Sequence, residues 1–378
     1  MIIGADIRVL GTGLHSGVQE YTEQVLAHMV ALDPDVQWRL FYAGRTALER
    51  HPWMDAPNVS ITDTRSSNRF LWARTRLTGR PYLDKLVGDA DVFFFPHFLL
   101  GAVSPACRRV MTWHDLSYER MPEFFSLGRR LWHQFQMQPR RQANQADRII
   151  AVSKSTADDL SALYGIPSDR ISVIHSGVAS DLRRSDAGDI ERYRTRMLLP
   201  RRFVLAFGTQ EPRKNLAGLI AAFERIIAQQ RFADVELVIA GPRGWLMRPL
   251  TRLAATSSAR TRITFIGPVR TDERALLLSS ASLLAYPSFF EGFGFPPLEA
   301  MACETPVVAA ANSALFETVA DAGILVDAYA PDRLAAAIAA VLDDAALAGE
   351  LRKRGKTHAA TFTWARAARQ TLDAIIRA

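Results

Sequence analysis

Short apolar runs alternate with longer stretches of helical periodicity along the whole sequence. The runs of the first half include IIGADIRVL, VQWRLFYAG, DVFFFPH, RRVMTWHD and DRIIAVS, and helical stretches such as VQEYTEQVLAHMV follow them. Strands joined through helices pair in parallel, because the crossover returns the chain to the same end of the sheet. The alternation therefore predicts a parallel sheet with helices on both faces.

A second series of apolar runs begins after residue 200, with FVLAFGT, VELVIAG, ITFIG, SLLAYPS, TPVVAA and GILVD. The polar stretch at residues 178–200 separates the series and is the predicted linker. The sequence thus predicts an α/β fold of two doubly wound, Rossmann-like domains. We expect an N-terminal domain at 1–182, a C-terminal domain at 183–359 and a last helix at 360–378. Ligands of such sheets bind outside the carboxyl ends of the strands, so two facing sheets would form an interdomain cleft.

Composition excludes several protein classes. With 48% hydrophobic and 22% charged residues, the chain is neither fibrous nor disordered. Asp6 and Arg8 interrupt the first apolar run, which is too short and too charged for a signal peptide or membrane span. Cys107 and Cys303 form neither a disulfide framework nor a metal-ligand spacing. These features predict a cytoplasmic protein with reduced cysteines.

Basic residues are concentrated in one part of the chain. The net charge of +7 favours anionic partners. Between Arg65 and Lys85, six basic residues and one acid are interleaved with phenylalanine, leucine, tryptophan and tyrosine. This composition suits an anionic membrane surface. A solvated basic face over core residues explains it equally well, and nucleic acid is the weaker third candidate.

A glycine-rich loop, GTGLHSG, follows the first apolar run. Gly11, Gly13 and Gly17 lead into a predicted helix, and such loops let backbone N–H groups approach a phosphate or sugar. The dinucleotide fingerprint requires a different glycine spacing and an acid at the end of the second strand. Arg45 stands there instead, which disfavours NAD, although arginine could meet the extra phosphate of NADP. A plain tight turn is the competing interpretation.

Two cations precede a predicted helix in GTQEPRKNLAGLIAAF. Asn215 is typical of a helix N-cap, so Arg213 and Lys214 lie just before the positive end of the helix. Cations cost roughly 0.3–1 kcal/mol of stability at that end, and a bound anion would offset the cost. Arginine grips phosphate oxygens through two hydrogen bonds while lysine adds a point charge. We expect a diphosphate site rather than a solvated surface pair.

Histidines lie near the ends of two predicted strands. His114 comes at the carboxyl end of the run MTWHD, where open sheets bind ligands, although a structural histidine is as good an interpretation. His15 in the glycine-rich loop could face the same cleft. We expect His97, inside FFFPHF, to be a packing residue.

Two glutamates flank glycines and prolines in EGFGFPPLEAMAC. Pro296 and Pro297 suit a first helical turn, which would place Glu299 in that turn and Glu291 in the loop before it. Carboxylates accept hydrogen bonds from vicinal hydroxyls, so the pair could bind a sugar and a ribose on either side of a diphosphate. A hydrolase pair of carboxylates is the alternative, although Arg213 and Lys214 argue against it. A purely structural explanation is also open, with Glu299 stabilising the helix start and Glu291 as a surface acid of the loop.

Asp89 and Asp91 resemble a metal-binding pair, but they precede a strand and predict a turn. The pattern of His, Cys and acidic residues indicates no metal site.

Taken together, these motifs resemble a retaining family-4 glycosyltransferase of the GT-B fold over nearly the whole chain. The matching segments, in order, are GTGLHSGVQEY, TWHDL, AVSKST, GTQEPRKNL and EGFGFPPLEAMAC. The resemblance implies transfer of a sugar from a nucleoside diphosphate sugar to an acceptor, with retained anomeric configuration and without a metal. The segments HDLSYERMPEFF and EPRKNLAGLI resemble mannosyltransferases of bacterial surface polysaccharides such as lipopolysaccharide. This resemblance implies mannose or a 6-deoxyhexose as the transferred sugar, with GDP-mannose as the expected donor.

The resemblance also implies roles for individual residues. Arg213 and Lys214 would hold the diphosphate, Glu291 the hydroxyls of the transferred sugar, and Glu299 the ribose. His114 would help to orient the sugar. Donor contacts would also come from Gly11, from Gly13, which would close against the phosphates from the opposite domain, and from the backbone of Gly292, Phe293 and Gly294. No protein nucleophile is needed, because the departing phosphate oxygen takes the acceptor's proton.

Two segments depart from the family pattern. Glu304 stands where glycine is common, which puts the usual helix end in doubt, and HSGVAS replaces Asn-Gly-Val-Asp. In the family the last helix crosses back to the N-terminal domain, and we expect Phe362 and Trp364 to anchor it there.

The acceptor is expected to be a glycan or a lipid diphosphate-linked glycan at the inner membrane surface. The cluster Arg129, Arg130, Arg140 and Arg141 would suit such an acceptor, with the Arg65–Lys85 stretch. A non-catalytic nucleotide-sugar-binding protein of a glycan-assembly complex is the competing class.

Overall fold

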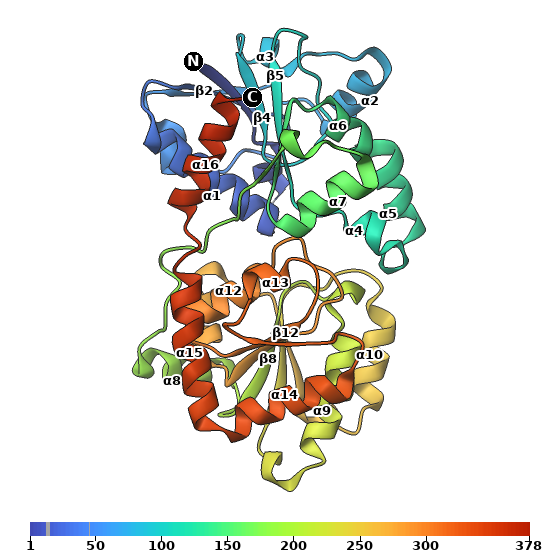
Figure 1. Cartoon of the computed structure of the whole chain (residues 1–378), viewed down its shortest axis with the longest axis vertical. Helices are drawn as coiled ribbons and strands as arrows, with labels where there is room; N and C mark the ends of the chain where they lie inside the picture. Colours follow the sequence, from blue (N-terminus) through green and yellow to red (C-terminus); the bar gives the residue numbers. More distant parts are fainter. Residues whose placement is uncertain (13–15, 45) are drawn as a thin grey trace. The chain divides into compact units, whose positions relative to one another are not determined.

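The computed structural model describes residues 1–12, 16–44 and 46–378. The chain divides into two compact units, Met1–Gly177 with Thr363–Ala378 and Val178–Phe362. Each unit contains a parallel sheet flanked by helices (Figure 1), which confirms the two predicted α/β units. The interdomain cleft stays a prediction.

The first unit has seven strands among its described residues, in the order β3-β2-β1-β4-β5-β6-β7. The strands are β1 (Ile2–Asp6), β2 (Gln37–Tyr42), β3 (Val59–Asp63), β4 (Val92–Phe95), β5 (Arg108–Trp113), β6 (Arg148–Ala151) and β7 (Ile171–Val173). All neighbouring strands are parallel, and β1 pairs with β4 through Ile3 opposite Val92. The central strands are apolar and buried, as expected of a sheet covered on both faces.

Two groups of helices cover this sheet. Its helical elements include η1 (Arg8–Thr12), α1 (Gly17–Leu32), α2 (Asn68–Thr78), α3 (Leu83–Leu86), α4 (Ser117–Arg120), α5 (Leu127–Leu131), the π-helix η4 (Trp132–Met137), α6 (Pro139–Gln145), α7 (Lys154–Tyr164) and α16 (Trp364–Ile376). Figure 1 shows α1 and α16 on one side of the strands and α2, α6 and α7 on the other. On the second side Leu71 of α2, Ala143 of α6 and Leu160 of α7 share one core with alternate strand residues.

The last helix belongs to the first unit, which confirms its predicted return. Trp364 is buried and packs edge-to-face on Tyr21 of α1, with ring centroids 5.9 Å apart. Gly177 leaves room for this helix start, because a Cβ there would lie 2.2 Å from the backbone nitrogen of Trp364. Phe362 is a correction: it lies in the second unit, where its ring packs on His358 and Phe293.

The second unit has six strands in the part of the chain that is described, in the order β10-β9-β8-β11-β12-β13. They are β8 (Phe203–Phe207), β9 (Glu236–Ala240), β10 (Ile263–Gly267), β11 (Leu283–Tyr286), β12 (Val307–Ala310) and β13 (Ile324–Val326). The helical elements include α8 (Ala187–Met197), η6 (Pro212–Lys214), α9 (Leu216–Ile227), α10 (Met247–Thr256), α11 (Arg274–Ser280), α12 (Phe295–Ala302), α13 (Leu315–Thr318), α14 (Pro331–Asp343) and α15 (Ala345–Ala359).

The boundaries differ from the predicted ones. The first unit ends at residue 177 instead of 182, and the second ends at 362 instead of 359. The predicted linker at residues 178–200 lies wholly within the second unit and contains α8. Tyr193 and Leu199 are buried there in the core of the second sheet. A polar helix with so few buried apolar residues resembles a linker in sequence.

Among the described residues, no helix combines the length and the apolar character needed to span a bilayer.

Candidate active site

The second sheet reverses its strand order at β8. From β8 the chain adds β9 and β10 on one side and then β11, β12 and β13 on the other. The loops after β8 and β11 therefore leave neighbouring strand ends toward opposite sides of the sheet. Such a switch point creates a crevice at the carboxyl edge, where α/β proteins bind their ligands.

These two loops carry three of the predicted site residues. Arg213 and Lys214 form the end of η6 after β8, and Glu291 lies in the loop after β11. Asn215 joins the loops, since its side chain caps α9 at Gly218 N (3.1 Å) and donates to the carbonyl oxygens of Pro287 (3.1 Å) and Ala328 (2.8 Å). Its φ of +53° is one that asparagine tolerates. The predicted N-cap is confirmed.

Arg213, Lys214 and Glu291 form a buried ion cluster with Glu211. Glu291 lies 3.0 Å from Arg213 and 2.7 Å from Lys214. Arg213 also reaches Glu211 at 2.6 Å, and Lys214 donates to the hydroxyl of Tyr286 at 2.5 Å. The four charged side chains are between 4% and 13% exposed. The cations are therefore not a solvated surface pair.

The cluster shifts the pKa values of its members. Burial alone would raise the pKa of Glu291, but the charges of Arg213 and Lys214 outweigh burial and lower it to about 2. Burial lowers the pKa of Lys214 and raises that of Tyr286 well above its ordinary value. Glu291 is therefore an anion at neutral pH, with no proton to donate and only a weak tendency to accept one.

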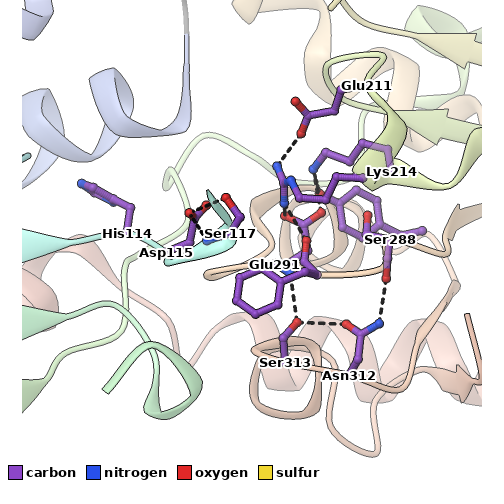
Figure 2. A network of polar contacts seen from close by, with 12 residues as sticks. His114, Asp115, Ser117, Glu211, Lys214, Ser288, Glu291, Asn312 and Ser313 are labelled. Atoms are coloured by element: carbon purple, nitrogen blue, oxygen red, sulfur yellow. Dashed lines mark hydrogen bonds and ion pairs between the residues drawn. The ribbon is translucent and has the colours of Figure 1, made fainter. Parts of the chain in front are cut away.

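Hydrogen bonds from a third loop hold Glu291 in place (Figure 2). The backbone nitrogen of Glu291 donates to Ser313 Oγ at 2.9 Å, and Ser313 donates to Asn312 Oδ1 at 2.9 Å. The Asn312 side chain then donates to the Ser288 carbonyl oxygen at 2.8 Å. Ser313 has a left-handed φ of +41°, so its side chain is placed at some backbone cost.

Glu299 lies one residue deeper in its helix than predicted. The helix α12 begins at Phe295, one residue before Pro296, which makes Glu299 its fifth residue and not part of the first turn. Its carboxylate is 3% exposed and pairs with Arg274 of α11 at 2.5 Å. Glu299 therefore belongs to a second ion pair, and its role with ribose stays a prediction.

The residues between the two glutamates have structural functions of their own. Gly294 adopts φ +98° at the start of α12, and a Cβ there would lie 2.9 Å from Leu315. The Phe293 ring is buried and packs against Phe295 and Phe362. Only backbone groups of Gly292, Phe293 and Gly294 are candidates for ligand contacts, as predicted, and those contacts are untested.

The end of α12 accommodates the unusual Glu304. The helix ends at Ala302, and Glu304, two residues later, adopts a left-handed φ of +56°. Glycine is favoured there because it lacks a Cβ. Glu304 pairs with Lys356 of α15 at 2.7 Å.

His114 lies at the carboxyl edge of the first sheet, directly after β5. Its Nε2 atom is 2.8 Å from the carbonyl oxygen of Pro96, which follows β4, and its ring packs edge-to-face on Tyr21. Burial lowers the pKa of His114. His97 packs on Phe98, and burial together with the nearby His114 and His133 lowers its pKa to about 3. Both imidazoles are therefore neutral at pH 7.

The glycine-rich loop is only partly described. Gly13 and His15 lie outside the described residues. Gly11 lies in η1, and a Cβ there would lie 2.0 Å from the Tyr42 hydroxyl. Packing on Tyr42 thus explains glycine at position 11, and its contact with a donor is untested.

The acidic pair at Asp89 and Asp91 forms a turn. Asp89 has φ +72°, and Asp91 accepts a hydrogen bond from Ile2 N at 2.8 Å. The described part of the chain contains no group of three or more His, Cys, Asp or Glu side chains arranged to hold a metal ion.

The structure thus brings Arg213, Lys214 and Glu291 into direct contact, while Glu299 has its own partner and His114 and Gly11 belong to the other unit. Sequence reasoning missed the residues that complete or support the cluster, namely Glu211, Tyr286, Asn312 and Ser313. It also missed Arg274, the partner of Glu299. Glu211 could have been found as the acid two residues before Arg213. The other residues reach the site through contacts between distant parts of the chain, for which the sequence offers no local signal.

Two family models match the chain. Residues 15–182 match "Glycosyltransferase Family 4", and residues 190–358 match "Glycosyl transferases group 1". Among curated relatives, "O-antigen chain mannosyltransferase B" of Escherichia coli is 31% identical over 78% of this chain and 75% of its own length. "D-inositol 3-phosphate glycosyltransferase" of Salinispora tropica is 36% identical over 61% of this chain and 50% of its own length. The "Serotype-specific mannosyltransferase WbdA" of Escherichia coli is 31% identical, but the match spans only 31% of that longer protein.

Solved structures show the same fold. WaaG, "a glycosyltransferase involved in lipopolysaccharide biosynthesis", superposes with a TM-score of 0.73 at 16% identity, over 99% of both chains. Anabaena Alr3699/HepE, solved in complex with UDP and glucose, has a TM-score of 0.74 at 18% identity, over 100% of both chains. These similarities confirm the GT-B fold.

Proposed function

This chain belongs to the family-4 glycosyltransferases, and from this premise we propose that it transfers a hexose from a nucleoside diphosphate sugar, with retained anomeric configuration. The proposed acceptor is a glycan or lipid-linked glycan of a cell-surface polysaccharide, met in the cytoplasm at the inner membrane face. The names of the mannosyltransferase relatives support mannose as the transferred sugar and GDP-mannose as the donor.

The observation that carries the proposal is the buried cluster of Arg213, Lys214 and Glu291 at the switch point of the second sheet. Burying four charged groups is costly, and buried groups with shifted pKa values cluster at functional sites. The cations suit the negative charge that develops on a departing diphosphate. Two cations can stabilise this charge without a metal ion, which supports the proposed metal independence.

Glu291 suits substrate orientation better than proton transfer. A general acid or base works best with a pKa near the working pH, whereas the pKa of Glu291 is about 2. In the proposed mechanism the diphosphate becomes a partner of Arg213 and Lys214, and Glu291 accepts hydrogen bonds from the sugar hydroxyls. The departing phosphate oxygen takes the proton of the acceptor. The protein contributes orientation and charge stabilisation.

The other donor contacts are proposed in the same way. Glu299 would bind the ribose after its pair with Arg274 rearranges or extends to the ligand. The backbones of Gly292 to Gly294 would approach the sugar and phosphates, as would Gly11 and Gly13, and His114 would orient the sugar.

The test is a thermal-shift screen followed by product analysis. A ligand that binds only the folded state raises the melting temperature. We expect GDP and GDP-mannose to raise it more than UDP and UDP-glucose, and EDTA to leave the shifts unchanged. Nuclear magnetic resonance of the product should then show the anomeric configuration of the donor. An inverted product would overturn the retaining mechanism, and a larger shift with UDP-glucose would overturn the proposed donor.

The screen also separates an enzyme from a binding protein. Donor binding without transfer or donor hydrolysis, over a broad panel of glycan and lipid-linked acceptors, would support the non-catalytic alternative.

A further inference from the structure

Exposed apolar side chains gather on two adjoining segments of the first unit. Six of the sixteen large apolar side chains that are exposed among the described residues belong to residues 68–78 and 127–137. They are Phe70 (62%), Leu77 (83%), Leu127 (67%), Leu131 (44%), Trp132 (43%) and Phe135 (55%). Phe70 and Leu77 are seven positions apart on α2 and share one face of that helix.

Hydrogen bonds join these two segments into one surface. Trp72 of α2 donates through its indole nitrogen to the Gln136 carbonyl oxygen at 2.6 Å. Arg76, the neighbour of Leu77, donates to the carbonyl oxygen of Phe135. The exposed apolar side chains of α2, α5 and η4 therefore belong to one contiguous face, which we call the α2–η4 face.

The charge of this face has one sign. Residues 65–85 carry six basic residues and residues 126–145 carry four, namely Arg129, Arg130, Arg140 and Arg141. Asp84 is the single acid in both segments, and it is buried and bonded to Ser104. Exposed arginines such as Arg69 and Arg74 lie beside Phe70 on α2. Apolar side chains within a cationic rim complement the anionic, apolar interface of a phospholipid bilayer.

A cavity of about 340 Å³ opens beside this face. Its lining includes Arg76 of α2, Arg141 of α6 and Arg109 of β5, with Asp147 as its acid. Arg109 is 5% exposed and is held by the Gly101 carbonyl oxygen (2.6 Å) and Gln145 (3.4 Å). Asp147 accepts the backbone N–H of Arg109 at 2.6 Å. Three guanidinium groups against one carboxylate leave the cavity cationic.

The cavity is distinct from the candidate active site. Arg109 is the second residue of β5 and Asp147 precedes β6, so the cavity lies at the amino ends of these strands. His114 lies at their carboxyl ends. Arg76 and Arg141 come from the helices that border the α2–η4 face, and Arg141 bonds to Gln138, which in turn bonds to the Phe135 carbonyl oxygen.

We propose that the α2–η4 face docks on a membrane containing anionic phospholipids, and that the arginine-lined cavity seats the phosphate of a lipid headgroup. The apolar side chains enter the interface while the surrounding arginines pair with lipid phosphates. The inference deepens the proposed function, on which it rests for the lipid-linked acceptor, by naming the surface that would hold the enzyme where that acceptor lies.

The experiment is co-sedimentation of the 378-residue chain with vesicles, without donor or acceptor. We expect binding to vesicles of phosphatidylcholine with phosphatidylglycerol, and little binding to phosphatidylcholine alone. Phe70→Ser combined with Leu77→Ser should lower the partition coefficient at least about tenfold. Arg76→Gln combined with Arg141→Gln should lower it by roughly tenfold or more, and high salt should reduce this difference.

Matched variants control for exposure and charge. Leu198→Ser removes an apolar side chain that is 89% exposed in the second unit. Arg366→Gln with Arg369→Gln removes two exposed arginines from α16, on the other side of the first sheet. Both should bind vesicles as the wild type does. Wild-type protein that ignores phosphatidylglycerol, or controls that lose as much binding as the test variants, would overturn the proposal.

Two further measurements separate the sources of failure. Inorganic phosphate that stabilises the wild type but not the Arg76→Gln/Arg141→Gln variant, without vesicle binding, would make the cavity a free-phosphate site and refute docking. The donor-induced thermal shift should be unchanged in all surface variants. Vesicle binding with no donor shift would instead contradict the proposed function and leave the docking surface standing.

Discussion

The two units share the same parallel-sheet architecture, but they carry different side chains at the point where the strand order reverses. Each sheet reverses its strand order beside its first strand, at β1 and β4 in one unit and at β8 and β11 in the other. The second unit fills this point with a cluster of four buried charged groups. In the first unit the strands nearby end in the neutral histidines His97 and His114, packed on aromatic rings. The fold is repeated, whereas among the described residues a cluster of four buried charged groups lies at this point in only one of the two copies.

Buried ion pairs make the difference sharper. In the first unit Arg8 pairs with Asp6, two residues away, through contacts of 2.5 to 3.0 Å, and also donates to the Leu100 carbonyl oxygen. In the second unit Glu291 comes from a loop far along the chain from Arg213 and Lys214. A local pair stabilises its own turn. A pair between loops can exchange partners with a ligand.

The largest expected effect separates these two arginines. Arg213→Ala should lower kcat/KM about 100- to 1,000-fold, because it removes charge stabilisation of the departing diphosphate. Arg8→Ala should lower the melting temperature but leave the donor-induced shift intact, and Arg225→Ala, in an exposed pair with Asp332, should change neither. Release of the nucleoside diphosphate measures the rate. Full activity in Arg213→Ala would disprove the site assignment.

Gly177→Ala should destabilise the first unit by about 3 kcal/mol, because the new Cβ would lie 2.2 Å from Trp364 N and 2.6 Å from Thr363 C. Calorimetric unfolding should show the loss in the transition of the first unit. Gly128→Ala on α5 is the control, since a Cβ there meets nothing within 4 Å. Equal melting temperatures for the two variants would show that α16 does not depend on this contact.

Glu291→Gln should destabilise the second unit by roughly 3 kcal/mol at neutral pH. The folded-state pKa of about 2 lies below the ordinary 4.5, so this stability is present above pH 4.5 and is lost as pH falls toward 2. Urea unfolding at several pH values should show the gap between wild type and variant shrinking below about pH 4.5. Glu350→Gln, an exposed change on α15, should leave the stability unchanged. A gap that is constant down to low pH would contradict the ion cluster.

The first unit should lose stability over a higher pH range. The folded-state pKa of His97 is about 3, below the ordinary 6.5, so protonation of the unfolded chain lowers stability as pH falls from 6.5 toward 3. The loss should reach about 2 kcal/mol near pH 5. His97→Gln should flatten this slope, while Glu291→Gln should keep it. Amide hydrogen exchange, measured separately for each unit, would show which unit loses stability at each pH.

Glu304→Gly should have the smallest effect. Relief of the left-handed backbone contributes up to about 1 kcal/mol, and loss of the half-exposed pair with Lys356 offsets part of it. The melting temperature should stay equal or rise slightly. Lys356→Ala measures the ion pair alone, and a clear drop in Glu304→Gly beyond that of Lys356→Ala would show that the strain argument is wrong.

The sequence predicted the strands of both sheets except the two edge strands of the first sheet. The central strands have continuous apolar runs, whereas the edge strands β3 and β7, with sequences VSITD and ISV, carry too few apolar residues to be found and were missed. The linker was misplaced for a similar reason, because α8 contributes few side chains such as Tyr193 to the core. A continuous apolar run reveals a strand even at a sheet edge, as in β10, whereas a strand or helix with few apolar residues is missed.

Within the candidate site, the sequence predicted features that depend on neighbouring residues, but it did not predict which distant residues pair with each other. The Asn215 cap and the positions of Arg213 and Lys214 follow from short-range rules, and the structure confirms the cap. The pairing of Glu299 with Arg274 joins two helices, and no local signal announces it. The role of Ser313 was equally hidden, because it depends on a left-handed backbone angle and on a hydrogen bond with Glu291.

The return of α16 gives the molecule an order of assembly. The chain leaves the first unit at Gly177 and re-enters it at Thr363, and the ends of the second unit meet through a hydrogen bond from Val178 N to the Phe362 carbonyl oxygen at 3.0 Å. Synthesis proceeds from the N-terminus, and domains generally fold as units while the chain emerges. The second unit therefore has all its residues before the first one does. The unit that is made first must wait, with α1 and Tyr21 uncovered by α16, until the residues of α16 have left the ribosome.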